Sequence, residues 1–135
     1  MSTQDLVERF RRISEDGFGA GDLAVLDELL APDIVQHEPG PGQGDGLESI
    51  KAKVRMLHAG FPDLTATVAD IFGVDDRVCA RVTWSGTHTG EFAGLPPTGR
   101  TATWEGLDIA RFAEGRVVEH WGQVDRLGML QQLKA

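Results

Sequence analysis

The hydrophobic period of this chain changes once, at Leu64, and that change limits the folds open to it. Before Leu64, apolar residues recur at helical spacing, as Leu6, Phe10 and Ile13 do. After it, apolar and polar residues alternate along four stretches, which is typical of half-buried strands. Helices therefore come first and a mostly antiparallel sheet second, an order that indicates an α+β fold.

The sequence predicts three helices ahead of the sheet. The first ends at Gly17 and Gly19, the second follows the N-cap residue Asp22 and stops before Pro32, and the third covers 47–59. A brief strand is expected at 34–37, before the loop 38–46, whose four glycines and two prolines exclude regular structure. This loop is a candidate lid.

Long strands are expected at 64–72, 78–84, 101–112 and 116–124. The alternation that starts at Leu64 predicts Phe72 on the inner face. Asp125 is expected to cap a short C-terminal helix with Leu127, Leu130 and Leu133 turned inward. A strongly curved sheet wrapped on three helices leaves an internal apolar pocket, and we expect the function to sit there.

Size and composition exclude several classes of protein. A chain of 135 residues is expected to form one domain, 1–135. Its net charge of −8 and the lack of a basic cluster argue against nucleic acid and anionic membranes as partners, and no apolar run approaches the ~20 residues of a membrane span. A single cysteine, Cys79, allows no intrachain disulfide and indicates a cytoplasmic location.

Common cofactor signatures are missing from the sequence. It has no HExxH pair, no cluster with metal-ligand spacing and no glycine-rich nucleotide motif, so we expect neither a metal nor another cofactor. It also has no tyrosine, so acid/base work falls to histidine and aspartate.

The turn between the last two long strands decides which side chains meet. A three-residue turn, 113–115, with Gly115 as a bulge would set Asp108 opposite His120. A two-residue turn, 114–115, would set Asp108 opposite Trp121 instead. We favour the first, because glycine after an acidic residue suits that bulge. In that register, the strand face that carries Asp108 and His120 also carries Trp104, Ala110, Val118, Gly122 and Val124.

Asp108 and His120 are the candidate catalytic pair. An apolar pocket raises the pKa of a carboxyl group, and a neighbouring imidazole can share or relay its proton. A structural ion pair between two strands is the alternative interpretation, and the sequence does not separate the two.

The remaining candidates are substrate-binding residues. His37 and His88 lie at strand ends and are candidates to bind a substrate carbonyl or to hydrogen-bond a loop. Trp84 and Trp104 are candidates to stack on a polycyclic ligand or simply to fill the core. Phe92, in the segment 86–100, and the helix cap Asp125 complete the set.

Four segments resemble the SnoaL-like polyketide cyclases of the nuclear-transport-factor-two-like superfamily. They are FPDL (61–64), GTHTGEFAGLPPTGR (86–100), GLDIARFAEGRVVEHW (106–121) and VDRLGMLQQL (124–133). The resemblance implies a cone-shaped α+β domain, a homodimer joined through the outer sheet face, and a deep pocket without a cofactor. Family members of known function close a ring of an anthracycline precursor by an intramolecular aldol reaction.

The family's catalytic residues map only partly onto this chain. The cyclases carry their aspartate two residues after a histidine equivalent to His120, at the position of Gly122 here, and they carry a histidine at the position of Asp108. The carboxylate has thus moved to the neighbouring strand.

The sequence leads to one favoured function and two alternatives. We expect a cofactor-independent biosynthetic cyclase, of isomerase or lyase type, that closes a ring of a hydrophobic polyketide-like substrate by aldol-type or epoxide-opening chemistry. The alternatives are a non-catalytic protein that binds a small hydrophobic ligand, and a dimerisation module with a filled pocket.

Overall fold

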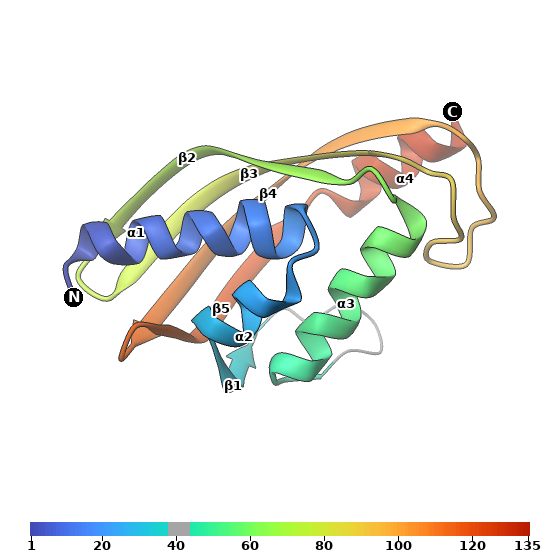
Figure 1. Cartoon of the computed structure of the whole chain (residues 1–135). Helices are drawn as coiled ribbons and strands as arrows, with labels where there is room; N and C mark the ends of the chain where they lie inside the picture. Colours follow the sequence, from blue (N-terminus) through green and yellow to red (C-terminus); the bar gives the residue numbers. More distant parts are fainter. Residues whose placement is uncertain (38–43) are drawn as a thin grey trace.

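In a computed structural model that describes residues 1–37 and 44–135, one curved five-stranded sheet packs against helices on one face (Figure 1). The strands are β1 (Leu30–Gln36), β2 (Thr65–Val74), β3 (Arg77–Thr87), β4 (Thr101–Ala113) and β5 (Arg116–Val124). The helices are α1 (Thr3–Arg12), α2 (Leu23–Leu29), α3 (Leu47–Gly60) and α4 (Arg126–Lys134), and a π-helical segment, Ile13–Gly19, continues α1. The α+β fold predicted from the sequence is confirmed.

The strand order is β1-β5-β4-β3-β2, with β1 parallel to β5 and every other pair antiparallel. The alternation predicted for β3 is confirmed, since Val78, Ala80, Val82 and Trp84 are all buried. They face the apolar sides of α1 and α3, so that the core lies between the sheet and the helices.

Capping side chains begin three of the helices. Ser2 and Asp5 form a reciprocal capping box at α1, in which Ser2 Oγ accepts from the Asp5 N–H at 3.1 Å and Asp5 Oδ2 accepts from the Ser2 N–H at 3.0 Å. Asp22 and Asp125 cap α2 and α4, as predicted. Such a cap stabilises a helix by about 1 kcal/mol.

A bulge in β2 overturns one prediction about the core. The register shifts between Val68 and Asp70, so Phe72 points outward and is 57% exposed. Glu15, in the π-helical segment, accepts the Val68 N–H at 2.9 Å beside the bulge. A contact between distant segments therefore stabilises the irregularity.

A second bulge, in β5, overturns both predicted registers. The turn has two residues, Glu114 and Gly115, at φ 53° and 80°, so the favoured three-residue turn is wrong. The register of that two-residue turn holds as far as the Phe112–Val117 pair, and one shift at Val118 then places Asp108 opposite Gly122. Consequently Val117, and not Val118, takes the buried position on the inner face.

The remaining differences are at the ends of elements. β1 begins at Leu30, four residues before the predicted strand. Leu127, predicted inside, is 67% exposed, and Met129 is buried together with Leu133. Most of the predicted loop 38–46, with its candidate role as a lid, lies outside the described residues. No described helix combines the length and apolar character needed to cross a membrane.

Candidate functional site

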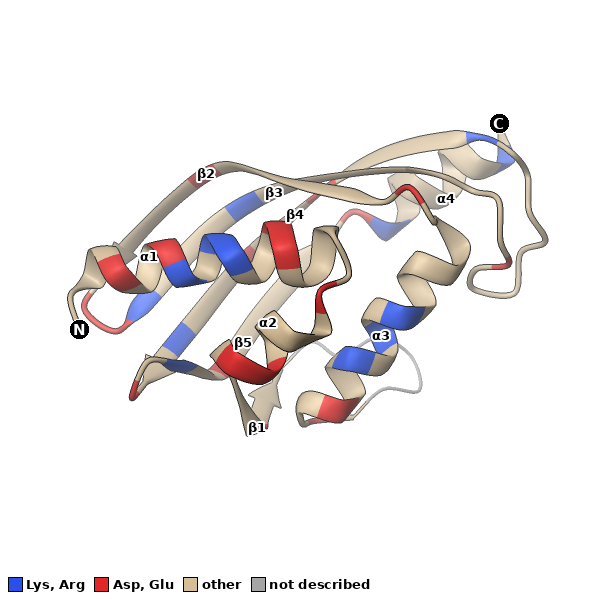
Figure 2. Ribbon diagram, in the orientation of Figure 1, with Lys and Arg blue, Asp and Glu red and all other residues tan. Residues whose placement is uncertain are grey.

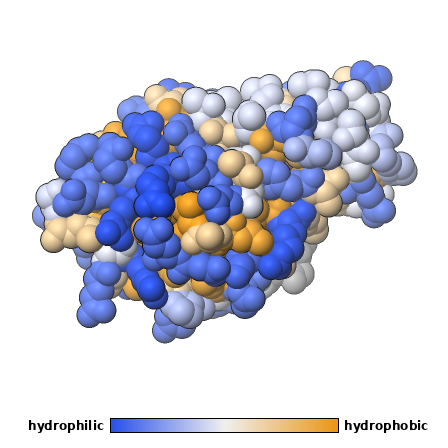
Figure 3. All heavy atoms as spheres, in the orientation of Figure 1, coloured by the Kyte–Doolittle hydropathy of each residue, from blue (hydrophilic) through white to orange (hydrophobic). Residues whose placement is uncertain are grey.

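A pocket lies between the inner face of the sheet and the helices, and it opens to solvent. Its walls are mainly apolar and come from α1, the π-helical segment, α3, α4 and four of the strands. Seen from the helix side, apolar side chains show through the middle of a mostly polar surface (Figure 3). This apolar lining suits a small hydrophobic ligand. The polar groups at its walls are few: Ser14, Gln36, Lys53, Asp108, His120 and Arg126.

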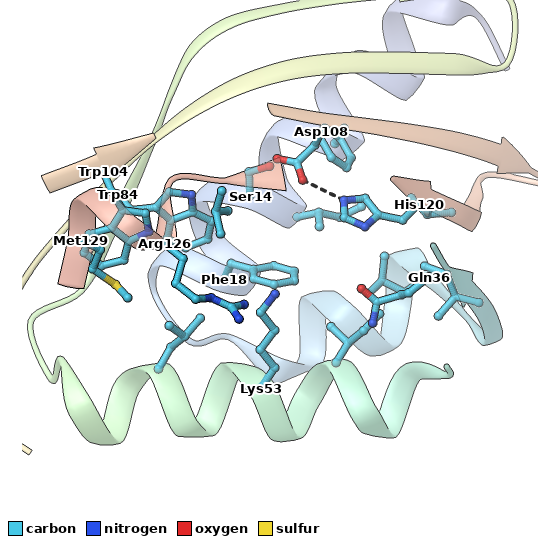
Figure 4. Close-up of a pocket in the computed structure, with 18 of the residues that line it drawn as sticks. Ser14, Phe18, Gln36, Lys53, Trp84, Trp104, Asp108, His120, Arg126 and Met129 are labelled. Atoms are coloured by element: carbon cyan, nitrogen blue, oxygen red, sulfur yellow. Dashed lines mark hydrogen bonds and ion pairs between the residues drawn. The ribbon is translucent and has the colours of Figure 1, made fainter. Parts of the chain in front are cut away.

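Asp108 and His120 meet inside this pocket, as the sequence analysis expected, although not as directly opposed residues. They occupy diagonal positions on the same face of β4 and β5, and His120 Nε2 lies 2.8 Å from Asp108 Oδ1 (Figure 4). The side chain of Asp108 is 18% exposed and that of His120 is 24% exposed. A carboxylate and an imidazole are thus held together against apolar walls with access to the pocket.

Gly122 makes this diagonal contact possible. It is the residue directly opposite Asp108, and a Cβ added there would lie 2.8 Å from Asp108 Oδ1 and 2.8 Å from His120 Cε1. Real Cβ atoms do not approach this closely. The missing side chain therefore leaves the space that the pair occupies.

Aromatic side chains form one wall of the pocket. Trp84 and Trp104 are paired residues on β3 and β4, and Phe92 and Phe18 also line the cavity. The indole Nε1–H of Trp84 is buried without an acceptor among the described residues. A buried donor of this kind is unfavourable in the free protein.

Ser14 comes from the π-helical segment, which packs closely on the sheet. A Cβ at Gly19 would lie 2.9 Å from the backbone nitrogen of Ala66, so this approach requires glycine. Ser14 is buried and lines the pocket. π-Helical turns often occur at functional sites.

Lys53, Arg126, Gln36 and Ser14 are pocket residues that sequence reasoning missed. Lys53 interrupts the apolar stripe of α3, three residues after Ile50 and four before Leu57, and both of those also line the pocket. A lysine within an apolar helix stripe is the sequence signal that could have identified Lys53 as a pocket residue. Burial lowers the pKa of the Lys53 ammonium, the positive charge of Arg126 lowers it further, and the negative charge of Asp108 raises it.

His37 lies on the other face of the sheet. It follows Gln36, which lines the pocket, and its Nε2 lies 2.6 Å from Glu119 Oε2. Its ring stacks on Trp121 with centroids 4.7 Å apart. Arg111 Nε donates to Glu119 Oε1 at 2.8 Å, so His37 belongs to a polar cluster on the outer face.

His88 and Asp125 have backbone or loop partners. His88 is fully buried, does not line the pocket, and its Nδ1 accepts from the Thr98 N–H at 3.3 Å. Asp125 Oδ1 accepts from the Gly128 N–H at 2.9 Å as the cap of α4. The structure thus brings together Asp108, His120, Trp84, Trp104 and Phe92, and it places the other three candidates outside the pocket lining.

The described residues contain no group of three histidine, cysteine, aspartate or glutamate side chains that could hold a metal ion. The pocket therefore offers acid/base groups, two cations and an aromatic wall as its chemical resources.

Comparisons with known proteins agree with this fold. The model of a family described as SnoaL-like polyketide cyclase matches residues 8–133. Aklanonic acid methyl ester cyclase DauD of Streptomyces sp. (strain C5) is 32% identical over 139 residues, which cover 98% of this chain and 83% of that protein. Nogalonic acid methyl ester cyclase of Streptomyces nogalater is 27% identical, over 86% of this chain and 88% of that protein. Among solved structures, wild-type IdmH from Streptomyces antibioticus is 38% identical with a TM-score of 0.82, and the match covers all of both chains.

Proposed function

The chain belongs to the SnoaL-like polyketide cyclase family, and on that premise we propose that it is an enzyme that closes a ring of a polyketide substrate by acid/base chemistry, without a cofactor. The observation that carries the proposal is the contact between Asp108 and His120 within an apolar pocket.

The proposed reaction is an intramolecular aldol addition. Asp108 takes a proton from a carbon next to a carbonyl group, which leaves an enolate. The enolate carbon attacks a second carbonyl of the same molecule, a carbon–carbon bond forms, and the new alkoxide takes the proton back from Asp108. Opening of an epoxide would use the same pair for its proton transfers.

His120 and Trp84 have supporting roles in this scheme. The His120 ring bonds Asp108 Oδ1 and so fixes the direction of the carboxylate. The unpartnered Nε1–H of Trp84 is the donor that we assign to the developing oxyanion. Trp104 and Phe92 would hold the flat rings of the substrate.

The resemblance to the cyclases supports a relocated base. The family's aspartate stands at the position of Gly122, and a side chain there would project into the place where Asp108 meets His120. A carboxylate carried by β4 can therefore serve the same part of the pocket as one carried by β5.

The same glycine favours a second candidate function. A pocket that has lost the family's aspartate suits a protein that binds a hydrophobic ligand without turning it over. In that case Asp108 and His120 would be a structural ion pair.

Turnover by the Asp108→Asn variant separates the two functions. We would assay aromatic polyketide acids and their methyl esters, including aklanonic acid methyl ester, and follow ring closure by chromatography. Asp108→Asn should lower turnover by about 10²–10⁴-fold, whereas Asp70→Asn, the same change at an exposed position of β2, should leave it unaltered. Equal turnover by wild type and Asp108→Asn would exclude the proposed base. Tight binding without turnover by wild type would favour the binding protein.

A further inference from the structure

Two positive charges enter the pocket across from the Asp108–His120 pair. Figure 4 shows Lys53 rising from α3 and Arg126 reaching in from the start of α4, both toward the space between Phe18 and the two tryptophans. Lys53 is half-buried, and Arg126 is exposed at the pocket mouth. Basic residues occur along α3, whereas the neighbouring α2 carries none (Figure 2).

Neither cation has a protein partner within the described part of the chain, where the recorded ion pairs involve other basic residues. Lys51, on the same helix, gives the contrast. Its Nζ lies 2.9 Å from Asp27 Oδ1 and 3.4 Å from Glu48 Oε2, on the outside of the protein. In a chain with net charge −8, acidic residues thus neutralise Lys51, and among residues 1–37 and 44–135 none forms a hydrogen-bonded ion pair with Lys53.

Two like charges at one apolar pocket repel each other, and burial makes the charged form of Lys53 still less favourable. An anion between them would remove both penalties. The planar guanidinium of Arg126 matches the two oxygens of a carboxylate, and the ammonium of Lys53 supplies a second charge-assisted hydrogen bond. A methyl ester carries no charge and would leave both cations unpaired.

We propose that Lys53 and Arg126 form a subsite for a carboxylate group of the substrate, so that this chain prefers a polycyclic polyketide acid to its methyl ester. This inference rests on the proposed function, because it names the substrate class of the same pocket. The carboxylate would lie away from the reacting carbon, since the two cations face the Asp108–His120 pair across the cavity. This preference would set the chain apart from its relatives named as methyl ester cyclases.

Binding of a matched acid and ester tests the subsite without any turnover. The probes are 9,10-anthraquinone-2-carboxylate and its methyl ester, titrated into the whole protein by calorimetry. The acid should bind wild type about 100-fold more tightly than the ester, because Lys53 and Arg126 would each supply a charge-assisted hydrogen bond worth about 10-fold. Lys53→Met and Arg126→Gln should each weaken binding of the acid about 10-fold and leave binding of the ester within about twofold.

Lys51→Met and Arg55→Gln are the matched controls on α3. Lys51 is paired outside the pocket, and Arg55 is exposed and is not a lining residue. Both variants should keep the preference for the acid. Equal affinity of wild type for the two probes would overturn the proposal. So would an equal loss for acid and ester in Lys53→Met, because that result would mean that the lysine only packs against the rings.

The subsite and the proposed function can fail separately. If Lys53→Met lowers turnover of an ester but acid and ester bind equally, the cations serve the developing oxyanion and the subsite is wrong, while the cyclase proposal stands. If the acid preference is found but Asp108→Asn retains full turnover, the subsite stands and the proposed base is wrong.

Discussion

Asp108 lies directly opposite Gly122, and because glycine has no side chain the Asp108 carboxylate can reach its diagonal neighbour on β5, His120. The absence of a side chain at position 122 is therefore part of the site. A residue larger than glycine at position 122 would have to displace one member of the pair.

Gly122→Ala should accordingly impair the pair. The added methyl group would overlap Asp108 Oδ1 and the His120 ring, and overpacking of this kind destabilises a protein by about 1–3 kcal/mol. We expect a lower urea midpoint together with a loss of turnover. Gly44→Ala is the control, since its Cβ would meet no atom within 4 Å. An unchanged midpoint and unchanged turnover in Gly122→Ala would show that the contact has no role.

Trp84→Phe tests the unpartnered indole donor. If the Nε1–H binds the developing oxyanion, turnover should fall by about 10²-fold while substrate affinity changes little. Loss of the Nε1–H should not itself lower the free energy of unfolding, because the variant loses no hydrogen bond: the donor has no acceptor among the described residues of the free protein. The check is kcat and KM measured beside urea unfolding. Trp104→Phe, on the paired residue, is the comparison. A kcat that stays at the wild-type value in Trp84→Phe would remove the assigned donor.

The outer face of the sheet predicts a homodimer. Phe72, Cys79, Ile109 and Trp121 form a row across four strands, and Phe72 and Ile109 are 57% and 41% exposed. An apolar row of this kind is typical of an interface. Sedimentation should give twice the chain mass of 14.6 kDa for wild type and the monomer mass for Ile109→Glu. Met56→Glu, at an exposed apolar position of α3, should remain a dimer. A monomeric wild type would contradict the prediction.

The outer-face cluster around Glu119 predicts a dependence of stability on pH. Hydrogen bonds from Arg111, and then from His37, lower the pKa of Glu119. A carboxylate with a lowered folded-state pKa stabilises the fold above its unfolded-state pKa, and the contribution is lost as the pH falls through the folded-state pKa. Glu119→Gln should therefore lower the free energy of unfolding at about pH 6 and have a smaller effect at about pH 3.5. Urea unfolding at both pH values checks this, and an equal difference at both would contradict it.

Much of this fold could be predicted from the sequence because it depends on local chemistry. The bounds of β5 follow from the hydrophobic period, and the caps Asp22 and Asp125 follow from side chains that bond nearby backbone. The burial of alternate residues on β3 has the same local origin.

The bulge in β2 could not be predicted, because a contact with a distant segment stabilises it. Glu15 bonds the backbone at Val68, and nothing near Val68 in the sequence indicates that contact. The contact between Asp108 and His120 was predicted from the wrong register, and it forms because diagonal neighbours on one face can also meet. Lys53 was missed because a lysine within a helix ordinarily faces water.

The most direct test of the central claim is exchange of the substrate's carbon-bound proton in D₂O. Bound polyketide should exchange the proton next to its carbonyl for deuterium in the presence of wild type, as followed by NMR. With Asp108→Asn the exchange rate should fall by about 10²-fold or more, while calorimetry gives an unchanged substrate affinity. Exchange at the wild-type rate in Asp108→Asn would contradict the assignment of Asp108 as the base.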